Sequence, residues 1–103
     1  MIQNKQEYIL CAAIWINDQT KNEHQPENIK SGYVICGRRH HNCFATYKII
    51  SKSFHIQKDI ITQGFLTSKN RFVDRQEAVN IAKTIKQIPD ELQIEKLFSE
   101  DLY

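Results

Sequence analysis

An uninterrupted apolar run at residues 8–16, YILCAAIWI, constrains the fold of this chain more than any other feature. It is rich in β-branched and aromatic residues and is too short for a typical amphipathic helix, so it predicts a buried strand. A polar, turn-like stretch follows it. Residues 32–37 form a second short apolar segment between two glycines, and together the two segments predict an antiparallel pair joined by a wide loop.

Helical spacing appears next, at residues 38–50. Phe44, Tyr47 and Ile50, with His40 and Cys43 on nearby turns, recur every three or four residues and predict one buried stripe. Residues 51–61 are polar and predict a loop.

A hairpin and a second helix are predicted in the last third of the chain. Residues 63–67 and 71–73 flank a Ser-Lys-Asn turn. Asp74 is the expected N-cap of the helix, with Glu77 at the third position of a capping box. Four apolar residues then line one helix face, and Pro89 is expected to end the helix. These four residues are Ala78, Ile81, Ala82 and Ile85. The apolar residues of 97–103 are expected to pack back on the fold.

Size and composition limit the function classes. The chain has 103 residues, 41% hydrophobic and 25% charged, with a net charge of +2, which predicts one globular α+β domain over residues 1–103, with a small antiparallel sheet and two main helices. Such a balance excludes a DNA binder driven by bulk charge. No apolar run reaches the roughly 20 residues of a membrane span. The polar start indicates no signal peptide, so we expect a cytoplasmic protein with its three cysteines reduced.

Residues 36–44 could form an anion site. Arg38 and Arg39 stand at the expected start of a helix, where free amides attract phosphate. A guanidinium adds a fork that matches two phosphate oxygens. Phe44, one turn on, offers a face for a base. In the alternative interpretation, the arginines are a solvated face and Phe44 belongs to the core.

A metal site is the competing interpretation of the same residues. Cys36, His40, His41 and Cys43 are all ligand types, but their spacing matches no standard zinc arrangement. Adjacent histidines on a helix point about 100° apart. We therefore expect no metal and no cofactor, and a buried reduced Cys43.

A second candidate site lies at residues 68–75. Arg71 and Arg75 could together neutralise a diphosphate, with Asn70 contacting a base or ribose edge. The alternative is a surface charge cluster at a hairpin tip, with Asp74 serving as a helix cap.

Three stretches, residues 32–44, 63–78 and 97–103, together resemble the first-described anti-Thoeris proteins of phages. The most specific strings are the double arginine followed by a double histidine and the sequence Arg-Phe-Val-Asp-Arg. The resemblance runs from Tyr8 to the end, apart from residues 51–61. It implies a small α+β protein that sequesters immune signalling nucleotides in the host cytoplasm.

Further expectations follow from this resemblance. Members assemble as dimers up to hexamers and bind glycocyclic ADP-ribose without degrading it, and some hold CBASS cyclic trinucleotides at a separate site. The resemblance assigns the cyclic ADP-ribose pocket to Phe44, Arg71 and Arg75, with Asn70 beside them. Chemistry alone suggests Arg38, Arg39 and His41 for the trinucleotide.

Two other function classes stay open. One is a small phage enzyme acting on nucleotides or RNA, with His40, His41 and Asp74 near the chemistry. The spacing favours no nucleophile–base pair, and the two separated His-x-Ser/Thr motifs of two-histidine phosphodiesterases are absent from the sequence. The other is a protein-interaction module whose oligomer interface is its only function.

Overall fold

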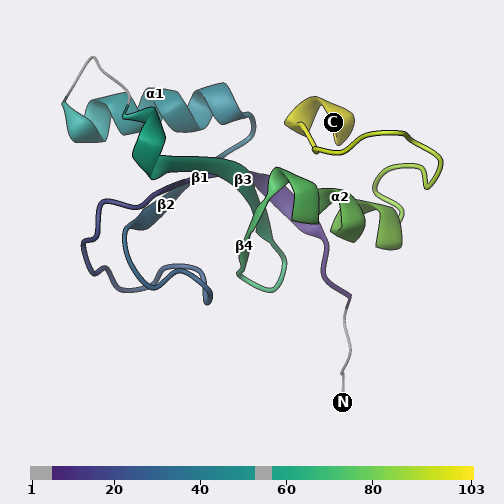
Figure 1. Ribbon diagram of the computed structural model, residues 1–103, viewed down its shortest axis with the longest axis horizontal. Coiled ribbons are helices and arrows are strands. Elements are labelled where there is room, and N and C mark those ends of the chain that lie inside the picture. The colour runs from purple at the N-terminus through teal and green to yellow at the C-terminus, as the bar shows by residue number, and fades with distance from the viewer. Residues whose placement is uncertain (1–5, 53–56) are drawn as a thin grey trace.

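A four-stranded antiparallel sheet in the order β2-β1-β3-β4 forms the centre of the molecule (Figure 1). The computed structural model describes residues 6–52 and 57–103. Its strands are β1 (Ile9–Ile16), β2 (Tyr33–Gly37), β3 (Ile61–Thr67) and β4 (Phe72–Asp74), its helices α1 (His40–Ser51) and α2 (Arg75–Thr84), and its short 3-10 turns η1 (Lys58–Ile60) and η2 (Ser99–Asp101). The predicted α+β fold is confirmed.

The apolar run at the start of the chain becomes the central strand β1. Ile14 lies opposite Ile35 of β2 on one side and opposite Gln63 of β3 on the other. The register with β3 shifts between Ile9 and Cys11. A strand with neighbours on both sides has its backbone groups satisfied by the sheet, which suits a segment with few polar side chains.

Both helices cover the same face of the sheet. α1 packs on β1 and β2, and α2 packs mainly on β3 and β4. Their inward side chains join the strands in one core, in which Ile14, Phe65 and Leu97 are fully buried. The expected return of the C-terminal residues is therefore confirmed at Leu97. No helix among the described residues combines the length and apolarity needed to cross a membrane.

The predicted stripe of α1 is correct in its middle and wrong at its end. Cys43 and Tyr47 are buried, and Phe44 is partly buried against the core. Ile50 is 53% exposed, because it lies in the last turn, beyond the last residue of α1 that the core covers. Of the predicted loop at residues 51–61, residues 53–56 lie outside the described residues; within the rest, α1 continues to Ser51, η1 forms, and β3 begins at Ile61.

The predicted start of α2 is confirmed and its predicted end is wrong. The Asp74 carboxylate accepts a hydrogen bond from the Glu77 amide at 2.8 Å. The helix ends at Thr84 rather than at Pro89. Lys86 adopts a left-handed conformation with φ 65°, and the following amide, of Gln87, donates to the Ala82 carbonyl at 2.7 Å. This is a Schellman turn, which reverses the chain before the proline is reached.

The loop of residues 17–32 covers part of the other face of the sheet. The Trp15 indole donates to the Ser31 carbonyl at 2.9 Å, which ties the loop to β1. The Asn28 side chain donates to the Phe72 carbonyl and accepts from the Phe72 amide, at 2.6 and 2.9 Å. At the opposite edge of the sheet, the Val34 amide donates to the Gln25 side chain at 2.9 Å. The loop therefore meets backbone groups of both edge strands.

Candidate functional site

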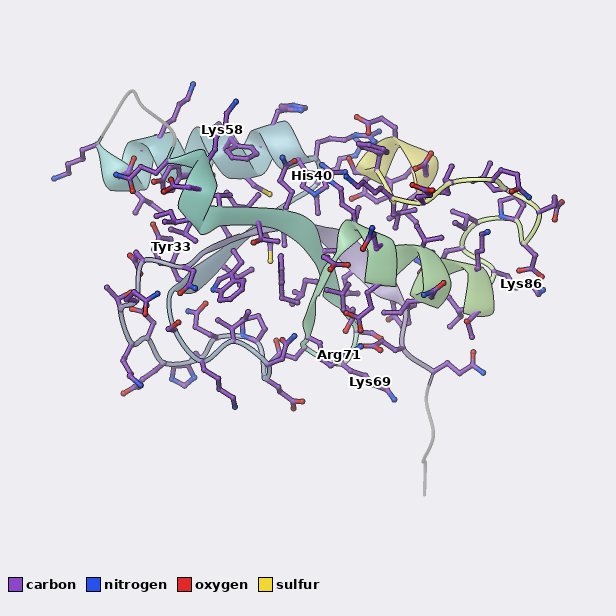
Figure 2. The ribbon with its side chains drawn as sticks, viewed as in Figure 1. Tyr33, His40, Lys58, Lys69, Arg71 and Lys86 are labelled. Atoms are coloured by element: carbon purple, nitrogen blue, oxygen red, sulfur yellow. The ribbon has the colours of Figure 1, made fainter. Side chains whose placement is uncertain are left out.

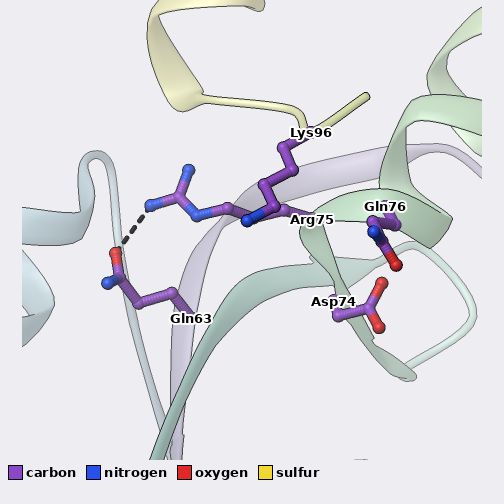
Figure 3. Close-up of a pocket in the computed structure, with 5 residues that line it drawn as sticks. All are labelled: Gln63, Asp74, Arg75, Gln76 and Lys96. Carbon is purple, nitrogen blue, oxygen red and sulfur yellow. Dashed lines mark hydrogen bonds between the residues drawn. The ribbon is translucent and has the colours of Figure 1, made fainter. Parts of the chain in front are cut away.

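A polar hollow of about 400 Å³ lies where the start of α2 meets β3 and the segment that follows α2 (Figure 3). We call it the Arg75 hollow; it is lined by Gln63, Asp74, Arg75, Gln76 and Lys96. Its volume falls in the lower part of the range of about 300–1,000 Å³ that small-molecule sites occupy.

Arg75 is the principal cation of this hollow. Its guanidinium donates to the Gln63 side chain at 2.6 Å and to the Leu97 carbonyl at 2.9 Å, both of which are neutral acceptors. Among the residues that the structure describes, no carboxylate lies within ion-pair distance of it. Burial lowers the pKa of Arg75, and the more distant Glu100 carboxylate offsets part of that effect. A partly buried cation with only neutral partners favours an incoming anion.

The other lining residues add one more cation and one acid. Lys96 reaches the hollow from the segment after α2, and it forms no ion pair with any described residue. The Asp74 carboxylate accepts a hydrogen bond from the Glu77 amide, and Figure 3 shows this carboxylate directed away from the Arg75 guanidinium. The hollow therefore combines two cations with amide side chains that can contact a sugar or base edge.

A smaller hollow of about 150 Å³ continues from the same strand. We call it the Phe44 hollow; it is lined by Phe44, Lys58, Ile61 and Gln63. Gln63 lines both hollows. The Phe44 ring of α1 and the cations of the Arg75 hollow therefore lie on either side of this one residue. The partly buried Phe44 ring packs on the core with one side and faces this hollow with another.

Arg71 lies apart from these hollows. Its guanidinium forms a two-point ion pair with Glu7, at 2.8 and 3.0 Å, and a third contact with Glu77 at 3.3 Å. The bond to Glu7 raises the pKa of Arg71, and the same bond lowers the pKa of Glu7. Lys58 and Arg71 lie near opposite ends of β3 (Figure 2). The structure thus gives Arg71 and Arg75 separate partners, where the sequence suggested one shared diphosphate.

Asn70 occupies the β3–β4 turn with φ 58°, a left-handed conformation that asparagine tolerates well. Its carbonyl accepts a hydrogen bond from the Glu27 amide at 2.8 Å. It lines neither hollow.

The double arginine before α1 contacts the end of the chain. The guanidinium groups of Arg38 and Arg39 lie 5.5 and 5.1 Å from the centroid of the Tyr103 ring. Arg39 also donates to the main-chain oxygen of Tyr103 and lies 4.0 Å from Glu100. His41 is exposed on the first turn of α1. These contacts stabilise the C-terminal segment, which we define as residues 97–103.

His40 turns inward while His41 faces solvent. The Nε2 atom of His40 lies 2.8 Å from the Gly64 carbonyl, and its ring meets Phe65 edge-on at 5.1 Å between centroids. Burial lowers the pKa of His40, which favours the neutral ring, and the bond to Gly64 opposes that effect. Two of the three residues of the enzyme hypothesis are therefore engaged in structural contacts, His40 with β3 and Asp74 with α2, while His41 is exposed.

The residues considered for zinc do not form a ligand cluster in the described part of the chain, where no three His, Cys, Asp or Glu side chains gather closely enough to hold a metal ion. Cys43 is buried, with its sulfur 3.7 Å from the Ala12 carbonyl. Burial raises the pKa of Cys43 to about 11. That environment makes Cys43 a core residue.

Five lining residues were not anticipated from the sequence: Lys58, Ile61, Gln63, Gln76 and Lys96. Gln63 could have been found, since the alternation of β3 places it on the same face as Phe65. Lys58 and Lys96 lie in segments without periodic pattern, so no local signal marks them.

The fold and the two hollows define a small α+β domain with a cationic, partly aromatic surface site. The chain belongs to the phage T4 y16D protein family, whose sequence profile matches residues 8–103. No curated protein and no solved structure matches it.

Proposed function

We propose that this phage-family protein binds and sequesters a cyclic nucleotide signal of the glycocyclic ADP-ribose type, without degrading it. The observation that carries the proposal is the environment of Arg75, a partly buried cation on the wall of a hollow, with neutral hydrogen-bond partners and Lys96 beside it. An anion can bind to these two cations, and a pyrophosphate carries two adjacent negative groups, one for each of them.

The Phe44 hollow supports the assignment to a nucleotide rather than to a simple anion. A base that stacks on Phe44 would place its sugar near Gln63 and its phosphates near Arg75 and Lys96, because Gln63 lines both hollows. Stacking on an aromatic side chain contributes about 1–3 kcal/mol per base. The proposed binding set is therefore Phe44, Lys58, Gln63, Arg75 and Lys96, and it omits Arg71, whose charge Glu7 and Glu77 already neutralise.

Sequestration requires a high affinity, which this surface can reach only if it makes several contacts with the ligand at once. Holding a signal below the threshold of its receptor takes nanomolar affinity, or about 12 kcal/mol. A ligand of this size gains on the order of 0.3 kcal/mol per non-hydrogen atom. Both phosphates and the base must therefore be engaged, and a second copy of the chain can enclose the faces of the ligand that these open hollows leave exposed.

The test combines calorimetry with recovery of the ligand. The protein is titrated with glycocyclic ADP-ribose, ADP-ribose and a cyclic trinucleotide, then heat-denatured, and the supernatant is analysed. Tight binding of glycocyclic ADP-ribose and its intact recovery support the proposal. Conversion of the ligand would instead establish the enzyme hypothesis, and failure to retain any of the three would favour an interaction module.

Variants locate the site. Arg75→Ala should weaken binding about 10- to 100-fold, the effect of losing a charged hydrogen bond. Lys96→Ala is an exposed change that leaves the fold intact and should also weaken binding, while Lys69→Ala removes the same charge at the β3–β4 turn and should not. Equal affinity of the two lysine variants would show that the ligand binds elsewhere.

A further inference from the structure

Two cysteines lie together on the face of the sheet opposite the helices. Ala13 of β1 pairs with Cys36 of β2, and Cys11 lies two residues before Ala13. Because side chains alternate along a strand, Cys11, Ala13 and Cys36 share one face, with the cysteines on a diagonal between adjacent strands. Cys36 is exposed and Cys11 is partly exposed, while Cys43 is buried on the helix side.

The nearby Cys36 thiol lowers the pKa of Cys11 to about 7, with a smaller contribution from the Gly37 amide, although burial opposes the change. The same interaction raises the pKa of Cys36. The other titratable groups near Cys11 are Cys43 of α1 and Tyr103 of the C-terminal segment, whose pKa values are raised mainly by burial and to a smaller extent by a Cys11 thiolate.

We propose that Cys11 and Cys36 form a reactive dithiol that exchanges with small disulfides such as oxidised glutathione, with Cys11 as the attacking thiolate and Cys36 as the resolving thiol. The Cys11 thiolate attacks one sulfur of oxidised glutathione, forms a mixed disulfide and releases one glutathione thiolate, which takes up a proton. Cys36 then loses its proton and attacks the Cys11 sulfur, which forms the Cys11–Cys36 disulfide and releases the second glutathione. Two protein thiols are oxidised and one glutathione disulfide is reduced to two thiols.

The diagonal placement makes this disulfide reversible. Diagonal positions in a sheet are about 7–8 Å apart between Cα atoms, slightly farther than an unstrained disulfide bridges. Closing the bond therefore draws β1 and β2 together and stores strain. A strained disulfide is reduced easily, so the pair responds to the glutathione balance instead of staying locked.

The experiment treats the full-length protein with oxidised glutathione at neutral pH, quenches it with acid at intervals, and follows intact mass and peptide maps. We expect a transient glutathione adduct on Cys11, then a product that has lost two hydrogens and contains a Cys11–Cys36 linked peptide. Cys43 serves as the internal control and should stay unmodified. Adducts that accumulate on Cys36 without linkage to Cys11 would overturn the proposal.

Two variants at one position separate the roles. Cys36→Ser keeps a hydroxyl that can donate to Cys11 but cannot resolve, so the reaction should be fast and stop at the mixed disulfide. Cys36→Ala lacks both functions, so the first step should slow about threefold at pH 7, because the thiolate fraction falls while the remaining thiolate becomes more nucleophilic. Equal first-step rates in the two variants, or a linked product from Cys11→Ser, would contradict the assignment.

Discussion

The guanidinium carbon of Arg75 lies 4.4 Å from the centroid of the Phe98 ring. This contact and the bond from Arg75 to the Leu97 carbonyl fix the main cation of the Arg75 hollow against the C-terminal segment. Residues more than twenty positions apart in sequence therefore determine where the positive charge lies. The proposed binding site depends on the packing of the C-terminal segment as much as on α2.

Phe98→Ala should weaken nucleotide binding about two- to fivefold, although Phe98 is not a lining residue of either hollow. The change removes the ring beneath Arg75 and with it a cation–π interaction that contributes about 0.5–1 kcal/mol. The guanidinium is then free to turn away from the hollow. Calorimetric titration with glycocyclic ADP-ribose measures the effect. Tyr8→Ala removes another half-exposed aromatic ring outside the hollows and serves as the control.

The Glu7–Arg71 ion pair should make stability depend on pH on the acid side. The pKa of Glu7 is lowered in the folded protein from its ordinary value of 4.5, mainly by the bond to Arg71. Its contribution is therefore fully present above about pH 5 and is lost as the pH falls through the folded pKa. Urea unfolding from about pH 6 to pH 3 should show a steeper loss for the native chain than for Glu7→Gln. Parallel curves would mean that the pair contributes nothing.

Gly64→Ala should prevent stable folding, whereas Gly37→Ala should be tolerated at a modest cost. A Cβ atom at Gly64 would lie 2.0 Å from the Val73 carbonyl oxygen, a backbone atom that cannot move without separating β3 from β4. At Gly37 the closest atoms are the Asn42 Cβ at 3.1 Å and the Cys43 sulfur at 3.3 Å, and a displacement of a few tenths of an ångström at the start of α1 relieves these contacts. Circular dichroism and thermal melting compare the two; a cooperative, near-native melt of Gly64→Ala would contradict the packing described for β3.

Lys86→Gly should stabilise the protein by about 0.5 kcal/mol. The left-handed conformation of Lys86 costs a residue with a Cβ atom about 1–2 kcal/mol, and glycine avoids this while losing about 0.5–1 kcal/mol to greater freedom when unfolded. The lost ion pair with Asp90 is exposed and contributes little. Lys86→Ala loses the same ion pair and keeps the Cβ, so urea unfolding should rank glycine above alanine.

Local patterns were sufficient for most of the fold. The apolar run at β1, the glycines around β2 and the Asp74 cap each act over a few residues, and each predicted element formed. The errors arose at element ends. Ile50 continues the helical spacing of α1 but lies past the core. The end of α2 is set by Lys86, which adopts a left-handed backbone conformation that is rare for lysine.

The arrangement of charges was harder to foresee, because it depends on contacts between distant residues. Arg71 and Arg75 are four positions apart, yet the partner of Arg71 is Glu7, 64 positions away, while Arg75 bonds to Leu97. Likewise, Arg39 interacts with the C-terminal segment. The sequence pointed to Arg75, which lines the Arg75 hollow, but not to Lys58 or Lys96, and it could not show which cations the chain neutralises itself.

The contacts of Gln25 and Asn28 have a consequence for association between molecules. Each side-chain amide occupies the position that a neighbouring strand would take, Gln25 at Val34 and Asn28 at Phe72. A second chain could extend the sheet at these points only by displacing them. Fibre-like growth is therefore disfavoured at these positions on both edges.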